Sequence, residues 1–498
     1  MLQDSIPRRA LSISGGGILG VLGIAIWSAL LLTMLPASSL SDGSINILVA
    51  TSVFAFLLCF IISPSLIRCV DDRRVAYRLS LLIWWFLLVD EVYFTRRNVS
   101  YNMGQGTFPV LAYGEGAMWM LSFIVLVLVS LHHRSYLSRL FTGSMKWLSL
   151  FIFICLFSIT YAPGKMYALA WGFKLVLVVL ILQLCVEQMR DVADIATFLK
   201  VTLAAFFVLS VVPVIDAFTD PVSPFEDGRL NANPDLLSPT AASLLLVAIT
   251  LHTMKKSRYL VVVGFVSAAT MFLAFGKAGI LGGVLGVGIF MLMQRKILPG
   301  LRLFFGMGAL AAVIISVTPI AGYIASYDGI STLTGRTLVW QIAIPAIKDK
   351  LLLGHGYLGS YYAWKSTSGL VVGDIYLLHL HNAFLDVAYN SGLLGEGSLI
   401  IIHFIILRNL FRSIKLFRIL RILQPGSLQV RNVYIVTIGT LALYVHLFVQ
   451  ALFGSEFGGR CMSPYMLFLA VFLLADAVQR MNQRLLTFAT STQAQTTT

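Results

Sequence analysis

The sequence predicts an all-α membrane protein that crosses the bilayer many times. Apolar residues make up 58% of the 498 residues and charged residues only 12%, about half the charged share of an average soluble protein. Long uncharged apolar runs recur from one end of the chain to the other. Such runs favour helices in a bilayer, because a helix satisfies its backbone polar groups within one segment. The composition excludes a soluble enzyme, a secreted disulfide scaffold and a disordered chain.

The apolar runs predict about 12 to 14 transmembrane helices, each long enough to cross about 30 Å of hydrocarbon. The first run follows Arg8-Arg9, as in a signal peptide, but its apolar core is longer than a signal peptide requires, so we interpret it as a span. The predicted spans are residues 15–36, 45–67, 77–93, 115–133, 147–162, 166–187, 194–218, 238–254, 259–275, 278–294, 303–323, 382–407, 433–453 and 461–479.

The net charge of +14 indicates topology and lipid contact, not nucleic-acid binding. When the loops are assigned alternately to the two sides, the set that contains both termini carries most of the Lys and Arg, including Lys255, Lys256 and Arg258. The positive-inside rule therefore places both termini in the cytoplasm. Basic residues on that side also attract anionic membrane lipids.

We expect one integral membrane domain over residues 1–498, with three polar segments. Residues 219–237 form a non-cytoplasmic loop that contains Arg229, and residues 324–381 form the largest non-cytoplasmic loop, with short amphipathic helices. Residues 480–498 form a polar cytoplasmic tail. The five cysteines have no metal-type spacing, and the outer loops have no Asp-x-Asp motif, so we expect neither a metal nor a cofactor.

Three candidate site residues lie on the non-cytoplasmic side: Arg229, Arg336 and His381. If His381 belongs to a continuous helix, Gly392 lies about 20° and Gly395 about 40° from it around the axis, so the three share a face. Small residues on that face would let another helix or a lipid chain approach closely.

Each of these residues also has an ordinary interpretation. Arginine in an outer loop commonly contacts lipid headgroups, and a histidine at a helix entry is commonly an interfacial polar residue. His379 is an equally basic alternative to His381, and His355 lies in a Gly-His-Gly turn that is consistent with a mobile loop.

Two segments resemble the signature region of the O-antigen ligase and polymerase superfamily. The matching features are Gly335-Arg336 before a Trp-containing helix, a Gly-x-Gly-Tyr turn at residues 354–357, and His381-Asn382 followed by Gly392-x-x-Gly395. The superfamily includes O-antigen ligases, polymerases of O-antigen and exopolysaccharide repeat units, and protein O-oligosaccharyltransferases. The Gly-Arg-Thr and Gly-His-Gly-Tyr-Leu-Gly versions are most similar to the exopolysaccharide-production, polymerase-like branch.

The sequence departs from the family pattern at two places. Phe275-Gly276-Lys277 stands where family members often carry a Ser-Arg motif in a middle span. Arg229 is followed by Asn233-Pro234-Asp235, whereas the family usually has an arginine followed by a Pro-Asn pair.

The resemblance implies a GT-C-like glycosyltransferase whose donor is a saccharide on undecaprenyl pyrophosphate. His381 is then the catalytic base, because a neutral imidazole accepts a proton at pH 7. Arg229, Arg336 and Lys277 would bind the pyrophosphate, which suits guanidinium groups that stay charged and bind phosphate with two donors. The supporting residues would be Gly335, Asn382, Gly392, Gly395, Gly354, Gly356 and Tyr357.

We therefore expect a multi-pass enzyme of the bacterial inner membrane that polymerises lipid-linked repeat units at the periplasmic face, where both outer loops would lie. The alternatives are an O-antigen ligase with lipid A core as acceptor, a protein O-oligosaccharyltransferase, and a transporter of lipid-linked saccharide. A transporter would show ionisable residues near the midplane, and only Lys174 and Asp90-Glu91 suggest this. The expected partners are the lipid-linked glycan donor, a saccharide or lipid A core acceptor, membrane lipids and a chain-length regulator.

The loop between Arg336 and His381 would select the acceptor. Its aromatic side chains either stack on sugar rings or anchor the loop at the membrane interface. These residues are Tyr357, Tyr361, Tyr362 and Trp364.

Overall fold

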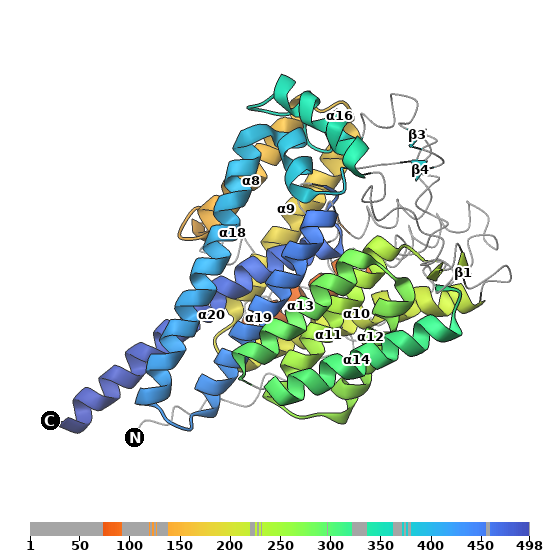
Figure 1. The fold of residues 1–498 in the computed structure, drawn as a ribbon. Helices are drawn as coiled ribbons and strands as arrows, with labels where there is room; N and C mark the ends of the chain where they lie inside the picture. Colours follow the sequence, from red (N-terminus) through yellow and green to blue (C-terminus); the bar gives the residue numbers. More distant parts are fainter. Residues whose placement is uncertain are drawn as a thin grey trace, which may run out of the picture. The chain divides into compact units, whose positions relative to one another are not determined.

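The computed structural model contains helices at every predicted span that falls within its described part (Figure 1). The chain forms two compact units, residues 1–76 with 105–132, and residues 77–104 with 133–498. Nearly all described residues belong to the second unit. The structure describes residues 73–91, 119, 122, 123, 126, 138–219, 225–226, 229–230, 232–295, 297–320, 336–361, 371–372, 375–376, 380–454 and 459–497.

The predicted all-α class is confirmed, with two short antiparallel strand pairs in the loops among the described residues. The helices are α4 (Arg73–Val89), α8 (Met145–Ser158), the 3-10 turn η3 (Ile159–Tyr161), α9 (Lys165–Gln188), α10 (Val192–Thr219), α11 (Pro234–Met254), α12 (Arg258–Ala274), α13 (Lys277–Met293), α14 (Ile297–Val317), α16 (Arg336–Asp349), α18 (Ala383–Leu423), α19 (Leu428–Phe453) and α20 (Ser463–Thr497). Strand β1 (Phe225–Glu226) pairs with β2 (Arg229–Leu230), and β3 (Val371–Val372) pairs with β4 (Ile375–Tyr376).

Within the described residues, six helices are long and apolar enough to cross a membrane: α9, α10, α11, α18, α19 and α20. Shorter apolar helices cover residues 145–161, 258–274, 277–293 and 306–317, where the sequence also predicts spans. The predicted spans at residues 15–36 and 45–67, and most of 115–133, lie outside the described residues. Helix α20 extends to Thr497, so the described part of the predicted polar tail continues this helix.

Glycines let α13 pack closely against α19. A Cβ atom on Gly282 would lie 2.7 Å from Nδ1 of His446, and one on Gly286 would lie 2.9 Å from the carbonyl oxygen of Ala442. Because the partners run in opposite directions, α13 and α19 are antiparallel. The first turn of α13 is therefore level with the last turn of α19.

Helix α11 is also antiparallel to α19, since His446 hydrogen-bonds the carbonyl oxygen of Pro239 at 3.1 Å and Gly439 packs against Thr250. The starts of α11 and α13 and the end of α19 therefore lie at one end of this bundle, which we call the site end. The end of α11 and the start of α19 lie at the opposite end.

Candidate functional site

Helix α16 packs against the segment that enters α18. Val339 of α16 belongs to the same buried cluster as Leu380. The indole N–H of Trp340 donates a hydrogen bond of 2.8 Å to the carbonyl oxygen of Leu380. These contacts bring the beginning of α16, which carries Arg336, to the residue that precedes His381.

The backbone around His381 is fixed by its neighbours. His381 has a φ of 49°, in the left-handed region that costs energy for a residue with a Cβ. The side-chain oxygen of Asn382 accepts a hydrogen bond of 3.0 Å from the backbone N–H of Leu385, which caps α18. Its amide nitrogen donates to the carbonyl oxygen of Leu452 at 3.2 Å, so Asn382 also ties the start of α18 to the end of α19.

His381 is a neutral imidazole beside a fixed cation. Burial of the ring and the nearby Arg336 guanidinium lower the pKa of His381 from 6.5 to about 3. The guanidinium carbon of Arg336 lies 6.0 Å from the ring centroid of Phe453, the last residue of α19, at the limit of a cation–π contact. A proton acceptor and a permanent positive charge are thus held together at the site end.

We expect the imidazole of His381 to stay neutral between pH 8 and pH 5, because its pKa is lowered to about 3. Side-chain NMR of histidine-labelled protein, with His381→Gln to assign the signal, measures this directly. Arg336→Gln should raise this pKa, since it removes a repelling charge. Between pH 6.5 and about 3, only the unfolded chain binds a proton here, so this residue lowers stability as the pH falls. A titration midpoint near 6.5 would contradict the buried position.

Lys277 and Arg229 lie beside the turn that joins α12 to α13. Lys277 is exposed and is the first residue of α13, where the helix N-terminus adds partial positive charge. Arg229 lies in β2, opposite Glu226 of β1. The next residue, Leu230, packs in one buried cluster with Ala274 at the end of α12.

Three predicted pyrophosphate-binding residues and the predicted base therefore occur at the site end. Arg336 and His381 interact electrostatically, whereas Lys277 and the strand of Arg229 lie at the neighbouring α12–α13 turn. The antiparallel packing of α13 on α19 makes this turn level with the end of α19, which Asn382 contacts.

The Gly-His-Gly turn is joined to a break in α18. Gly392 has non-helical angles, φ 63° and ψ −165°, within α18. The backbone N–H of His355 donates to the carbonyl oxygen of Tyr389 at 2.7 Å, and that of Gly356 donates to Asn390 at 2.9 Å. On the other side of the break, the backbone N–H of Leu393 donates to the carbonyl oxygen of Leu351, just before the turn, at 2.8 Å. The turn thus satisfies backbone groups that the interrupted helix leaves without partners.

The break corrects the expected arrangement of His381 and the glycines. The helix begins after His381 and is interrupted at Gly392, so the shared face that a continuous helix predicts does not exist. A Cβ on Gly392 would overlap the carbonyl group of Leu352, and one on Gly354 would lie 2.6 Å from the Gly392 nitrogen. The backbone of the turn, rather than a helix or a lipid chain, approaches Gly392.

His355 is a packed residue, and its interpretation as part of a mobile loop is wrong. Its imidazole stacks on Tyr389 with 4.4 Å between ring centroids. Its Nε2 atom forms a hydrogen bond of 2.8 Å with the carbonyl oxygen of Ala346, at the end of α16. His355 therefore joins α16 to α18 through contacts with Ala346 and Tyr389.

Tyr357 ties the turn to the segment that precedes α20. This fully buried residue donates its phenolic hydrogen to the carbonyl oxygen of Gly459 at 3.1 Å. A Cβ on Gly356 would overlap the backbone of Ala162, so the turn also lies against the segment that follows η3. Of the remaining predicted residues, Gly335, Tyr362, Trp364 and His379 lie outside the described residues.

Arg460 is a cation near the site that the sequence analysis missed. Its guanidinium carbon lies 4.8 Å from the ring centroid of Tyr361 and 6.0 Å from that of Trp171. Tyr361 in turn stacks on Tyr167, with centroids 5.1 Å apart. The available signal was an arginine in the short outer loop before the last predicted span.

The charges that suggested a transporter form a buried ion cluster. Nζ of Lys174 lies 3.3 Å from Asp90 and 3.2 Å from Glu91, and the lysine side chain is fully buried. The other carboxylate oxygen of Glu91 accepts a hydrogen bond from the backbone N–H of Ser463, the first residue of α20. This pairing joins α9 and α20 to the segment after α4.

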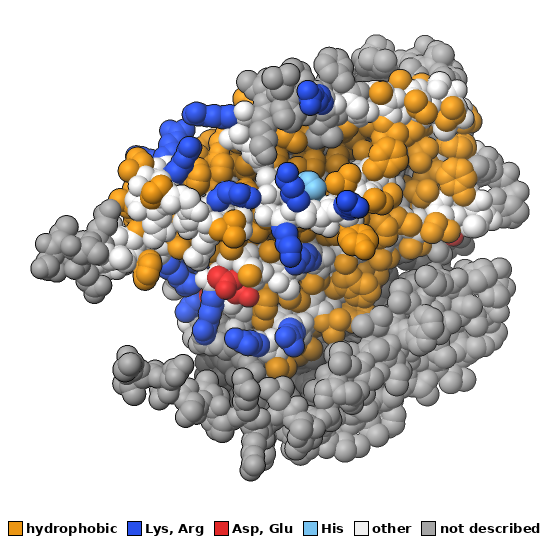
Figure 2. All heavy atoms as spheres, turned by 90° about the horizontal axis from the view of Figure 1, so that it is seen from below, with side chains coloured by type: hydrophobic (Ala, Val, Ile, Leu, Met, Phe, Trp, Pro, Cys, Tyr) orange, Lys and Arg blue, Asp and Glu red, His pale blue; other side chains and the backbone are white. Residues whose placement is uncertain are grey.

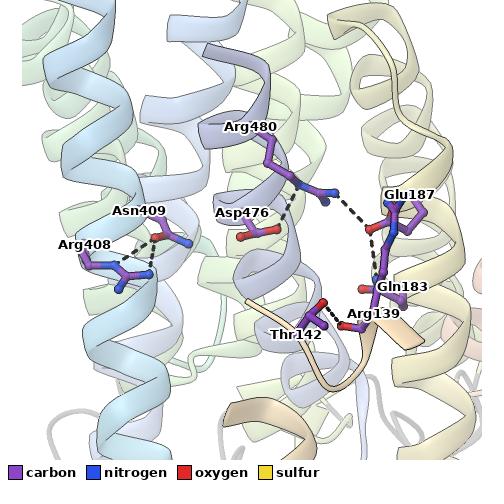
Figure 3. A network of polar contacts seen from close by, with 8 residues as sticks. All are labelled: Arg139, Thr142, Gln183, Glu187, Arg408, Asn409, Asp476 and Arg480. Carbon is purple, nitrogen blue, oxygen red and sulfur yellow. Dashed lines mark hydrogen bonds and ion pairs between the residues drawn. The ribbon is translucent and has the colours of Figure 1, made fainter. Parts of the chain in front are cut away.

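A second ion network lies towards the opposite end of α9. Glu187 contacts Arg139 and lies 3.0 Å from Arg480, which is 3.1 Å from Asp476 (Figure 3). Gln183 donates a further hydrogen bond of 3.1 Å to Glu187. Because each cation here has a carboxylate partner, we interpret the network as structural. Among the described residues, no group of three or more His, Cys, Asp or Glu is arranged to hold a metal ion.

Part of the predicted site lies in a region that matches a known protein family. Residues 262–400 match the family model described as O-antigen ligase. An exopolysaccharide production protein, ExoQ, of Rhizobium meliloti is 29% identical over 127 residues, which are 24% of this chain and 28% of that protein. The chain thus covers less than a third of this relative's length. The matched residues extend from α12 into α18 and include Lys277, Arg336 and His381, but neither Arg229 nor Arg460. Across this region, the chain is similar to members of the O-antigen ligase and polymerase superfamily.

Proposed function

We propose that the chain is an inverting membrane glycosyltransferase that polymerises oligosaccharide repeat units linked to undecaprenyl pyrophosphate. The product would be O-antigen or exopolysaccharide, made at the periplasmic face of the bacterial inner membrane. The observation that carries the proposal is the neutral His381 beside Arg336, in the region that matches the O-antigen ligase family.

In the proposed reaction, an acceptor sugar hydroxyl attacks the anomeric carbon of the donor. The hydroxyl proton moves to His381, the bond from the anomeric carbon to the pyrophosphate oxygen breaks, and the lipid pyrophosphate leaves with the bonding electrons. Arg336 stabilises the developing negative charge, and Lys277 and Arg229 are proposed to approach the same group. Without substrate, a pKa of about 3 makes His381 a weak base. The negative charge of a bound pyrophosphate would raise this pKa, because it would offset the positive charge of Arg336.

The choice between polymerase and ligase rests on what the relatives are called. The exopolysaccharide production protein supports a polymerase, in which the acceptor is a second lipid-linked repeat unit. The family model is described as O-antigen ligase, which supports the second candidate, transfer to lipid A core. Both reactions need the same base and cations, so an acceptor test must separate them.

The test uses purified protein in detergent with an undecaprenyl-pyrophosphate oligosaccharide, in EDTA, with and without lipid A core. We expect a ladder of glycans on a gel without added acceptor, because a polymerase uses a second lipid-linked repeat unit as its acceptor. The ladder should form in EDTA, because side chains supply the positive charge at the site end. A single shift that requires lipid A core would show the ligase instead. Product that appears only when a divalent ion is restored would contradict the metal-free mechanism, and no transfer under any condition would leave a transporter of lipid-linked saccharide as the alternative.

A further inference from the structure

A large apolar cavity lies at the opposite end of the bundle from His381. Its volume is about 1120 Å³, and it is lined by the end of α11, the start of α12, the end of α13, part of α14, the end of α18 and the start of α19. Typical small-molecule pockets measure about 300–1,000 Å³, so this cavity is large for a compact metabolite. Its apolar lining includes Leu245, Ile249, Leu260, Phe265, Met307 and Ile435.

Basic side chains from four separate segments line the same cavity. Lys256 comes from the α11–α12 connection, Arg295 from the end of α13, Arg418 and Arg421 from α18, and Arg431 from α19. All five are exposed, whereas most of the other residues that line the cavity are apolar. Figure 2, which shows the molecule from below the view of Figure 1, has Lys and Arg side chains gathered among hydrophobic ones on this face.

The rim carries a local excess of positive charge. The described residues that line the cavity include no Asp or Glu. The ion pairs found among the described residues also leave these five cations without a carboxylate partner. An isolated basic residue at a membrane surface is an ordinary topology signal, but several that converge on one apolar cavity favour an anionic ligand with an apolar part.

Local contacts hold the rim in place. The phenolic O–H of Tyr434 donates a hydrogen bond of 2.7 Å to the carbonyl oxygen of Met293, at the end of α13. Tyr434 also stacks on Phe417 of α18, with ring centroids 3.9 Å apart. Arg295 follows with a φ of 55°, a strained conformation for a residue other than glycine. The end of α13, the last turns of α18 and the start of α19 are therefore connected directly beside the arginines.

We propose that this cavity binds one anionic phospholipid of the surrounding membrane, with its phosphate at the basic rim and its acyl chains between α11, α12 and α14. Each half of the cavity matches one half of such a lipid, because apolar surface binds the chains and the guanidinium groups of the rim bind the phosphate. The proposal is independent of the proposed glycosyl transfer. A phospholipid here would connect α12 and α14 with α18 and α19 at the end opposite His381.

Native mass spectrometry of the full chain, released from detergent and titrated with phosphatidylglycerol or phosphatidylcholine, tests the proposal. We expect phosphatidylglycerol to bind at least about 10-fold more tightly, since each lysine or arginine near the headgroup contributes about 1 kcal/mol, which is about 5-fold. The double variant Arg418→Gln/Arg421→Gln should weaken phosphatidylglycerol about 10- to 30-fold. Its matched control is Arg412→Gln/Lys415→Gln, which removes two exposed charges of α18 that do not line the cavity.

A second pair of variants tests the apolar half. Gly264→Leu adds bulk at a residue that lines the cavity, whereas Gly288→Leu adds it at an exposed glycine of α13 outside the cavity, with open space around it. We expect only Gly264→Leu to reduce lipid binding, by about 10-fold or more. Intact mass and the thermal unfolding midpoint of lipid-free protein show that each variant folds.

Three results would overturn the proposal. Equal binding of phosphatidylglycerol and phosphatidylcholine would show that the rim does not select charge. An equal loss in the two double variants would indicate diffuse surface attraction instead of a site. Tighter binding of undecaprenyl phosphate than of phosphatidylglycerol, lost in Arg418→Gln/Arg421→Gln, would identify a polyprenyl carrier as the occupant in place of a phospholipid.

Discussion

His381→Ala is expected to lower the rate of glycan transfer by a factor of about 10² to 10⁴, the usual contribution of a positioned general base. The imidazole is neutral because burial and Arg336 lower its pKa to about 3, so it accepts the hydroxyl proton without first losing one of its own. Arg336 remains in the variant, and we therefore expect kcat to fall while the affinity for the lipid-linked donor changes little. Single-turnover transfer from a labelled donor measures the first quantity, and donor titration measures the second.

Two control variants separate loss of the base from loss of structure. His381→Gln keeps a polar side chain of similar size but removes the base, so it should be as inactive as His381→Ala. His403→Gln changes another buried histidine of α18, hydrogen-bonded to Tyr444 at 3.1 Å and within the helix rather than at its start, and should keep its activity. Full activity of folded His381→Gln would show that the base is another group.

The positions of the helices were predictable because they follow from local composition. Each apolar run in the described part of the chain became a helix, since backbone groups in hydrocarbon have no other partner within the segment. The sequence also showed that Arg336, the glycine turn and His381 follow one another along the chain. The structure brings Arg336 and His381 together through contacts of Trp340 and Asn382.

The break in α18 was not predictable from the run that contains it. Gly392 lies in an apolar stretch that reads as continuous helix, and its partners are residues of the turn some forty positions earlier in the sequence. The same limit applies to Arg460, whose aromatic neighbours Trp171 and Tyr361 come from two other segments. In the sequence, Lys174 suggested an ionisable residue near the membrane midplane, but only the fold shows that Asp90 and Glu91 are its partners.

Gly392→Ala is expected to destabilise the protein by about 2–6 kcal/mol and to abolish transfer, although Gly392 does not contact His381 in the proposed mechanism. Its φ of 63° and ψ of −165° belong to a region that glycine alone adopts readily, and an added Cβ would overlap the carbonyl group of Leu352. Relief of the overlap requires Leu352 and Leu353, which lead into the turn at residues 354–357, to move away from α18. The thermal unfolding midpoint in detergent and the transfer rate measure the two effects.

Gly397→Ala is the matched control, because Gly397 belongs to the same helix and has open space where the Cβ would lie. This variant should keep the wild-type unfolding midpoint or exceed it, since alanine favours helix over glycine. Movement of the turn would release His355 from Tyr389 and loosen α16, which carries Arg336, so the pKa of His381 should rise in any Gly392→Ala protein that remains folded. Equal unfolding midpoints for Gly392→Ala and Gly397→Ala would contradict the paired turn and helix break, and would leave the position of Arg336 dependent on the contacts of α16 with Leu380 and on its own contact with Phe453.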